Sequence, residues 1–180
     1  MRSYTPLSPP HLPRKAGLLM RRITLLLISM ALTVCVAASA AVAAEIQCSG
    51  DADCFGTNQA DTLTGTAEGD TIYGLGGPDI ILGLAGPDFI SGGSGGDEIR
   101  GGADADSILG GGGADELRGG YGVDEIIAGN GDDTVFGGPG GDIIDVSGDQ
   151  QYGFQDEVFC QGEDIVSADP NDILNNCILT

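Results

Sequence analysis

Gly-Gly-Ser-Gly-Gly-Asp-Glu-Ile-Arg at residues 92–100 and Gly-Gly-Tyr-Gly-Val-Asp-Glu-Ile-Ile at residues 119–127 are the clearest copies of a nine-residue repeat. A Leu, Ile or Val follows the aspartate of each copy by two residues, and a glycine precedes it by five, with Ala128 as the exception. The aspartate recurs every nine residues, ten times without an insertion, at Asp61, Asp70, Asp79, Asp88, Asp97, Asp106, Asp115, Asp124, Asp133 and Asp142. Repetition at one fixed period is typical of proteins built from stacked units.

The composition of one unit predicts its conformation. Glycine adopts backbone angles that are closed to other residues, so the glycine-rich first six residues are expected to form a turn. The last three residues are expected to form a short strand, in which the aliphatic side chain points away from its two neighbours. Because one such strand cannot bury its aliphatic side chain alone, the units must stack into a solenoid. Two units close one coil, so ten units predict about five coils and a length of about 24 Å.

The charge and glycine content of the chain exclude two classes of protein and leave two others. The 180 residues include 27 Asp and Glu, 7 Lys and Arg, and 32 glycines, with a formal net charge of -20. A nucleic-acid-binding protein needs cationic side chains against the phosphates, and a helical bundle tolerates few glycines, so both classes are excluded. The chain is therefore either a disordered polyanion or a fold that bound cations neutralise.

Residues 1–44 have a composition of their own. Five of the seven basic residues precede residue 23, no acid precedes Glu45, and Ile23 to Ala38 is an unbroken run of apolar and small residues. This order, followed by small residues at a cleavage site, is typical of a secretory signal peptide, with Met20 as an alternative start. An uncleaved membrane anchor is the other interpretation. Cleavage before Glu45 would leave 136 residues, in which two arginines oppose all 27 acids for a formal charge of -25.

Two disulfides are expected at the ends of the repeats. After the leader the chain has four cysteines, Cys48, Cys54, Cys160 and Cys177. An even number in an exported chain predicts two bonds, for which three pairings are open. Pairing of the first two and of the last two is favoured, because each pair lies at one end of the repeats.

Residues 45–55 and 146–180 are expected to cap the repeats of residues 56–145. A bare last coil would expose its aliphatic core and an unpaired strand edge, so a cap is required. In the C-terminal cap the repeat degenerates to a spacing of eight, and the triplets that begin at Asp156, Asp164 and Asp172 predict closing strands.

Over residues 56–145 the repeat resembles the RTX, or haemolysin-type, calcium-binding nonapeptide, Gly-Gly-x-Gly-x-Asp-x-(Leu/Ile)-x. The resemblance implies an all-β fold, a parallel β-roll (β-solenoid), with Ca²⁺ between successive turns along both edges. It also implies that the aspartate of each unit ligates calcium together with backbone carbonyls. Up to about eight ions would fit between the turns. The ligands would form two columns, one of Asp61, Asp79, Asp97, Asp115 and Asp133, the other of Asp70, Asp88, Asp106, Asp124 and Asp142.

Electrostatics favours the same metal. Stacked carboxylates repel one another without a counter-ion, and oxygen ligands on a flexible backbone suit Ca²⁺ better than Mg²⁺. The first two units lack their second and fourth glycines, so we expect Asp61 and Asp70 to bind weakly or to serve as a cap. Asp104 and Asp132 are expected to be solvated loop residues, and addition of their charge to a calcium site is the alternative. Capping of a turn by each aspartate is the explanation that needs no metal.

The resulting hypothesis is a secreted bacterial protein, exported by a Sec-type route, in which Ca²⁺ binding drives folding of the roll. No enzymatic activity is expected, because no His or Lys follows the leader and the repeats and caps fill the remaining chain. No nucleic-acid partner is expected, and the oligomeric state stays open. The alternative is a calcium-dependent adhesive module that binds a cell surface or matrix through calcium-bridged acidic edges or through outward apolar residues. The outward apolar residues are Ile80, Leu82, Phe89, Leu109, Ile127 and Phe136.

Overall fold

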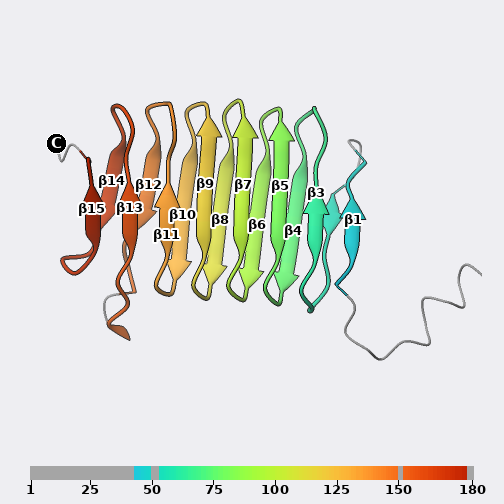
Figure 1. The fold of residues 1–180 in the computed structure, drawn as a ribbon, viewed down its shortest axis with the longest axis horizontal. Helices are drawn as coiled ribbons and strands as arrows, with labels where there is room; N and C mark the ends of the chain where they lie inside the picture. The colour runs from blue at the N-terminus through green and yellow to red at the C-terminus, as the bar shows by residue number, and fades with distance from the viewer. Residues whose placement is uncertain (1–42, 50–52, 150–151, 178–180) are drawn as a thin grey trace, which may run out of the picture. The chain divides into compact units, whose positions relative to one another are not determined.

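The computed structural model describes residues 43–49, 53–149 and 152–177, and the predicted signal peptide lies almost entirely outside these residues. The described residues form fifteen strands in two parallel sheets (Figure 1). The first sheet contains β1 (Glu45–Gln47), β3 (Thr62–Thr64), β5 (Ile80–Ala85), β7 (Glu98–Ala103), β9 (Glu116–Tyr121), β11 (Thr134–Phe136), β13 (Glu157–Phe159) and β15 (Ile173–Asn175). The second contains β2 (Cys54–Phe55), β4 (Thr71–Gly76), β6 (Phe89–Ser94), β8 (Ser107–Gly112), β10 (Glu125–Asn130), β12 (Ile143–Val146) and β14 (Ile165–Ala168).

Consecutive strands alternate between the two sheets, so the chain winds as a parallel β-solenoid of about seven turns. Between β3 and β12 the residues that pair within a sheet are eighteen positions apart, as in the pairing of Ile72 with Ile90 and of Ile90 with Ile108. The predicted coil of two nonapeptides is therefore confirmed. Among the described residues, no helix is long and apolar enough to cross a membrane.

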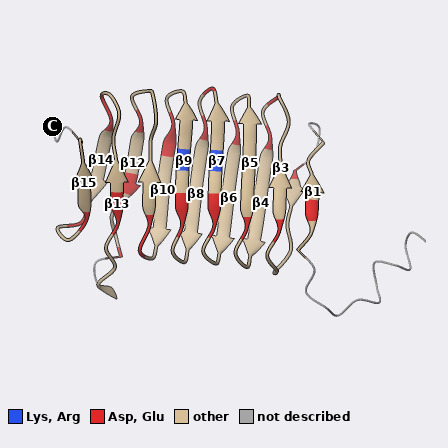
Figure 2. Cartoon of the chain, viewed as in Figure 1, with Lys and Arg blue, Asp and Glu red and all other residues tan. Residues whose placement is uncertain are grey.

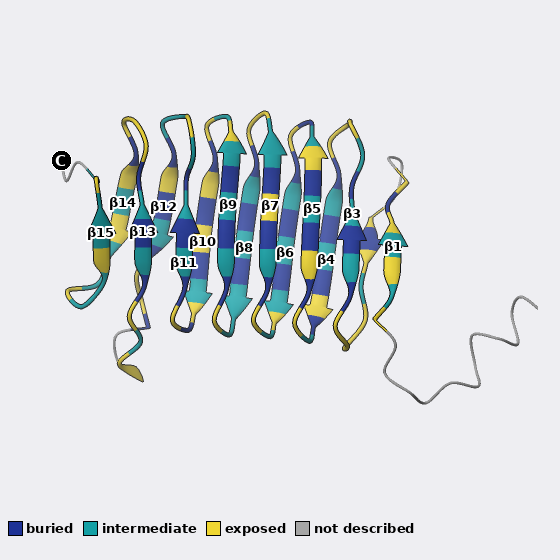
Figure 3. Cartoon of the chain, in the orientation of Figure 1, coloured by how far each residue is buried: buried dark blue, intermediate teal, exposed yellow. Residues whose placement is uncertain are grey.

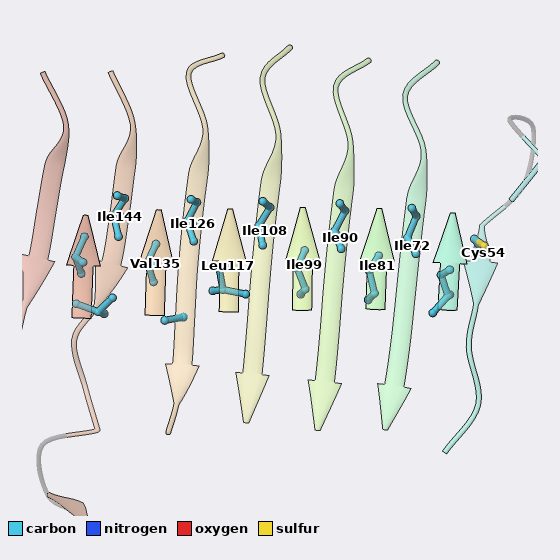
Figure 4. Close-up of a cluster of buried hydrophobic side chains, with 14 of the residues drawn as sticks. Cys54, Ile72, Ile81, Ile90, Ile99, Ile108, Leu117, Ile126, Val135 and Ile144 are labelled. Atoms are coloured by element: carbon cyan, nitrogen blue, oxygen red, sulfur yellow. The ribbon is translucent and has the colours of Figure 1, made fainter. Parts of the chain in front are cut away.

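The core of the solenoid is a thin layer of aliphatic side chains between the sheets (Figure 4). Each coil adds one aliphatic residue from each sheet, and complete burial of such a side chain stabilises the fold by about 1.5–3 kcal/mol. The core is as narrow as the repeat predicts. The largest fully buried side chains are Leu63, Ile72, Ile81, Ile90, Ile99, Ile108, Leu117, Ile126, Val135, Ile144, Val146 and Val158.

The strands are longer than the repeat predicts. Each strand from β4 to β10 has six residues and begins directly after an aspartate, so the prediction of three-residue strands and six-residue turns was wrong. Gly93 in β6 shows the reason. Its φ is +108°, and a Cβ on it would lie 2.3 Å from the carbonyl oxygen of Leu75 on the neighbouring coil. Glycine there allows adjacent coils to stack closely, rather than reversing the chain.

Both ends of the solenoid continue its sheets. β1 pairs with β3 and β2 with β4, while β13, β14 and β15 pair with β11, β12 and β13. The predicted closing strands are therefore present, and the end strands add turns to the five that the nonapeptides supply. Disulfides join Cys48 to Cys54 and Cys160 to Cys177, which confirms the favoured pairing.

The outer faces of the sheets are only partly apolar. Buried residues alternate along the strands with half-buried and exposed ones (Figure 3). Of the apolar residues expected to be exposed, Ile80 and Ile127 are 43% and 40% exposed. The other four are half-buried, Leu82, Phe89, Leu109 and Phe136. Phe136 is covered by a stacked aromatic neighbour on β13, since its ring centroid lies 4.7 Å from that of Phe159.

Candidate metal centres

Each nonapeptide places its aspartate at the end of a turn, directly before a strand. The solenoid therefore stacks the ten aspartates in two columns, one along each edge, as the spacing of nine predicts. Figure 2 shows acidic residues at the bends along both edges. All ten side chains are buried, with between 0% and 6% of their surface exposed. We call Asp61, Asp79, Asp97, Asp115 and Asp133 the first column, and Asp70, Asp88, Asp106, Asp124 and Asp142 the second column.

Within each column, one carboxylate oxygen binds the backbone of the neighbouring coil. The N–H of Asp61 donates to Oδ1 of Asp79 at 2.8 Å, and the same bond joins every later pair in both columns at 2.7–3.0 Å. The series continues beyond the nonapeptides. The N–H of Asp133 donates to Asp156, that of Asp142 donates to Asp164, and that of Asp156 donates to Asp172. Oδ1 therefore has a structural role that is independent of any metal.

The other carboxylate oxygen, Oδ2, has no partner in most of the column aspartates. It is buried without a hydrogen bond in all eight members from Asp79 to Asp142. Leaving a buried acceptor unpaired is destabilising, and buried acceptors normally have a partner, which can be an ion. These eight oxygens are therefore the groups of the columns that are free to bind a cation.

The first two aspartates differ from the rest. Thr57 donates its N–H and its hydroxyl to Oδ2 of Asp61 at 2.6 and 2.8 Å. Thr66 does the same for Asp70 at 2.6 and 3.0 Å. Both carboxylates are thus satisfied within their own turns, by threonines at a position that holds Leu75 and Leu84 in the next two units and glycine in the remaining ones.

The glycine that stands five residues before most of these aspartates lies close against Oδ2, and Ala128 before Asp133 is the exception. A Cβ on Gly101 would lie 2.4 Å from Oδ2 of Asp106 and 2.7 Å from the carbonyl oxygen of Gly119 on the next coil, so a larger residue would crowd both oxygens. The donors available beside the columns are therefore carboxylate and backbone carbonyl oxygens. An all-oxygen donor set of variable geometry suits Ca²⁺, and the absence of nitrogen and sulfur donors disfavours softer metals. The residues present at the columns fit calcium.

Burial makes ionisation of these carboxylates unfavourable. Loss of solvent raises the pKa of Asp79 to about 6 and that of Asp106 to about 7; a backbone hydrogen bond opposes each increase, and neighbouring aspartates add to it. Burial acts in the same direction on Asp61, but the hydrogen bonds from Thr57 and Ala44 outweigh it and lower the pKa of that group. At neutral pH the later members of the columns therefore need either protons or a positive counter-charge.

The described side chains do not supply this positive charge at the edges. Arg100 pairs with Glu98 at 2.6 Å and Arg118 pairs with Glu116 at 2.5 Å, in strands β7 and β9. In the part of the chain that the structure describes, no three His, Cys, Asp or Glu side chains gather closely enough to hold a metal ion. Calcium at the columns would therefore depend on backbone carbonyls as well as on carboxylates.

Two acidic residues beside the columns are solvent-exposed, Asp104 and Asp132. Asp104 accepts the N–H of Gly86 at 3.2 Å, and Asp132 accepts the N–H of Gln155 at 2.8 Å. Asp132 also lines an open groove along the first column, next to Asp115. Both side chains thus contact the turns while remaining in solvent.

Three buried aspartates were missed as candidate ligands. Asp149, Asp156 and Asp164 are 1%, 0% and 3% exposed. The triplets that predict the closing strands could have identified Asp156 and Asp164, because each precedes an aliphatic residue by two positions, as the column members do. Asp149 has no such signal, since no aliphatic residue follows it at that distance.

A comparison with known protein families identifies the repeats. A family profile described as the RTX calcium-binding nonapeptide repeat, in four copies, matches residues 55–90, 91–120 and 109–144. Together these segments cover half of the chain and include all ten column aspartates. No curated protein matches the chain.

Proposed function

Because this chain belongs to the family of RTX calcium-binding nonapeptide repeat proteins, we propose that it is a secreted calcium-binding protein whose β-roll folds when calcium binds. The eight unpartnered Oδ2 atoms of Asp79 to Asp142 carry this proposal. They are the ligands that calcium would share with backbone carbonyls of the adjacent turns. Asp61 and Asp70 act as caps, because threonine already satisfies their second oxygen.

Calcium couples to folding through the buried charge. Every nonapeptide from Asp79 onward buries one carboxylate that lacks a neutralising side chain. In the unfolded chain these carboxylates are hydrated, so without a cation the electrostatic free energy opposes the fold. Extracellular calcium-binding modules commonly bind in the range of about 10⁻⁴–10⁻³ M, so the chain would stay unfolded during export and fold outside the cell.

The organisation of the precursor follows from this role. Residues 1–44 would direct Sec-type export and be removed, residues 45–55 and 146–180 would cap the roll, and residues 56–145 would bind calcium. The two disulfides agree with an oxidising compartment. We assign the roll no catalytic activity, since its buried carboxylates are arranged as a repeated array instead of as one acid–base pair.

Circular dichroism on the exported, disulfide-bonded protein tests the proposal. Addition of CaCl₂ to chelated protein should produce the far-ultraviolet signal of β-structure, while an equal concentration of MgCl₂ should not. A chelated protein that already has its full β signal would contradict coupled folding. Calorimetric titration with CaCl₂ should then give several bound ions per chain. A titration that gives no bound ions would refute calcium binding itself.

An adhesive role is the second candidate, and one surface feature favours it. Ile143 on β12 and Ile165 on β14 pair in register and are 51% and 59% exposed. They form a small exposed apolar patch on the second sheet near the C-terminal end of the roll. Calcium-dependent retention of the protein on cell envelopes, lost when both residues are changed to serine, would support adhesion. Retention that is unaffected by these changes would count against this surface.

A further inference from the structure

The chain leaves the nonapeptide register just after β12. In the first column successive aspartates are eighteen residues apart up to Asp133, but the next N–H-to-carboxylate bond joins Asp133 to Asp156, which is twenty-three residues away. The turn after β12 is therefore five residues longer than the turns before it. Asp149 lies in this longer turn and belongs to no nonapeptide.

Asp149 takes the place of a backbone carbonyl. At the first edge the N–H of a turn glycine donates to a backbone carbonyl seventeen residues later, as Gly95 does to Gly112 and Gly113 does to Asn130. The next glycine in this series is Gly131, and its N–H donates to Oδ2 of Asp149 at 3.3 Å. Where earlier turns present a neutral carbonyl oxygen, this turn presents a carboxylate.

The hydrogen bond to Gly131 leaves the other oxygen of Asp149 unused. Asp149 is 1% exposed, and its Oδ1 is buried without a hydrogen-bond partner. Asp133 and Asp156, which are 1% and 0% exposed, each have an unpartnered Oδ2 as well. The negative charge of Asp149 acts on both of these neighbours. Three buried carboxyl groups with free oxygens therefore lie around one turn, and no described arginine is paired with any of them.

We propose that Asp149 is a ligand of an additional calcium ion, bound where the turn that ends at Asp133 meets the turn that ends at Asp156. The proposal rests on the proposed function, because it assumes that the roll binds calcium. The three carboxylates do not gather as closely as a site made only of side chains requires. Backbone carbonyls of the turn that ends at Asp133 would complete the ligand set, and such an oxygen-only environment selects calcium over softer metals.

Asp104 provides a matched comparison for this role. It accepts the N–H of Gly86, eighteen residues before it, just as Asp149 accepts the N–H of Gly131. Asp104 is exposed, and neither of its oxygens is buried without a partner. If accepting a turn N–H were the whole function of Asp149, removal of the charge should have the same effect at both positions. A calcium ligand should differ from Asp104 in the number of ions that the protein holds.

Native mass spectrometry with graded CaCl₂ counts those ions on the full exported protein. We expect Asp149→Asn, which keeps an acceptor for Gly131, to hold one calcium ion fewer than the wild type at saturation. Asp104→Asn should hold the wild-type number. An unchanged count for Asp149→Asn, in a wild type that binds calcium, would overturn the additional site and leave the proposed function intact. A wild type that binds no calcium would overturn both.

A second variant covers the case in which Asp149→Asn loses its β signal or more than one ion. Asp149→Glu keeps the negative charge and the carboxylate oxygens on a longer side chain. Return of the full ion count in Asp149→Glu, at a higher calcium concentration than the wild type needs, would support ligation. A count that remains short in Asp149→Glu would show that the position is structural, and the proposal would fail.

Discussion

Replacement of Asp106 by asparagine should change the stability of the roll in opposite directions with and without calcium. Asp106 is 3% exposed, its Oδ1 accepts the N–H of Asp88 at 2.9 Å, and its Oδ2 is buried without a hydrogen-bond partner. In Asp106→Asn the amide oxygen can keep the first bond, while a neutral amide nitrogen takes the place of Oδ2. The substitution thus removes a buried charge in nearly the same volume.

The size of the calcium-free effect follows from the ionisation of Asp106. Burial, opposed by the bond from Asp88 and reinforced by neighbouring aspartates, raises the pKa of Asp106 from 3.8 to about 7. At about 1.4 kcal/mol per pKa unit, ionisation of this side chain in the folded, calcium-free roll costs up to about 4 kcal/mol. We expect Asp106→Asn to stabilise that state by about 2–4 kcal/mol at pH 7.5, because the variant has no carboxylate to ionise.

With calcium the sign reverses. Asp106→Asn replaces an anionic ligand by a neutral one, so we expect the calcium concentration at the folding midpoint to rise about tenfold or more. Urea unfolding at a series of calcium concentrations measures both effects on one plot, with trimethylamine oxide added at low calcium to populate the fold. The lines for the wild type and the variant should cross, with the variant more stable at low calcium and less stable at high calcium.

Asp70→Asn is the matched control. Oδ2 of Asp70 already accepts the N–H and the hydroxyl of Thr66, so an amide nitrogen at that position would face two donors. We expect destabilisation of about 1–2 kcal/mol at every calcium concentration and no crossing. If Asp106→Asn behaved in the same way, its carboxylate would be a turn cap, and the argument for calcium from the unpartnered oxygens would be refuted.

Three further predictions test other parts of the structure. The calcium-free roll, held in trimethylamine oxide, should be most stable below about pH 4 and should lose stability as the pH rises through 6–7, because burial raises the pKa of most column aspartates. Circular dichroism against pH would measure this loss, and a stability that increases over the same range would refute the predicted direction. Gly101→Ala should destabilise the roll by about 1–3 kcal/mol in urea, because its Cβ would lie 2.4 Å from Oδ2 of Asp106. Gly112→Ala, with nothing within 4 Å of its Cβ, should be neutral or slightly stabilising, and equal effects of the two changes would show that the close approach of Gly101 to Asp106 does not limit the stability. Replacement of Cys160 and Cys177 by serine should cost about 3 kcal/mol of stability without changing the ion count per chain, and a reduced count would mean that the bond also shapes a calcium site.

The coil, its register and its core could be predicted from the sequence because one period determines all three. A spacing of nine places the same residue type on the same face of each strand, and a spacing of eighteen places it on the same sheet. The lengths of the strands could not be predicted in this way. A glycine such as Gly93 can reverse the chain or allow another coil to approach, and its local sequence is the same in both cases. Only contact with Leu75 on the neighbouring coil distinguishes them.

The candidate site likewise contains residues that the sequence predicts and residues that only the folded structure identifies. The column aspartates are predictable because each occupies a fixed place in its own unit. The difference between Asp70 and Asp106 was visible in outline, since Thr66 replaces a glycine, although its cause is a hydrogen bond that only the folded turn displays. Asp149 could not be found, because its partner Gly131 is determined by where the chain returns after an irregular turn.

The repeat itself explains why a cation and this fold belong together. Each nonapeptide buries one aliphatic side chain in the core and one carboxylate at an edge, so each added unit brings hydrophobic stabilisation and an unfavourable buried charge in fixed proportion. A longer roll therefore does not escape the electrostatic problem, as a globular domain does when its core grows faster than its surface. A calcium ion between successive turns would change the sign of the charge contribution for every unit at once. Folding of such a chain would then depend on calcium concentration in a cooperative manner. An ion between two coils stabilises both of them, and each of these coils also forms one side of the neighbouring calcium site.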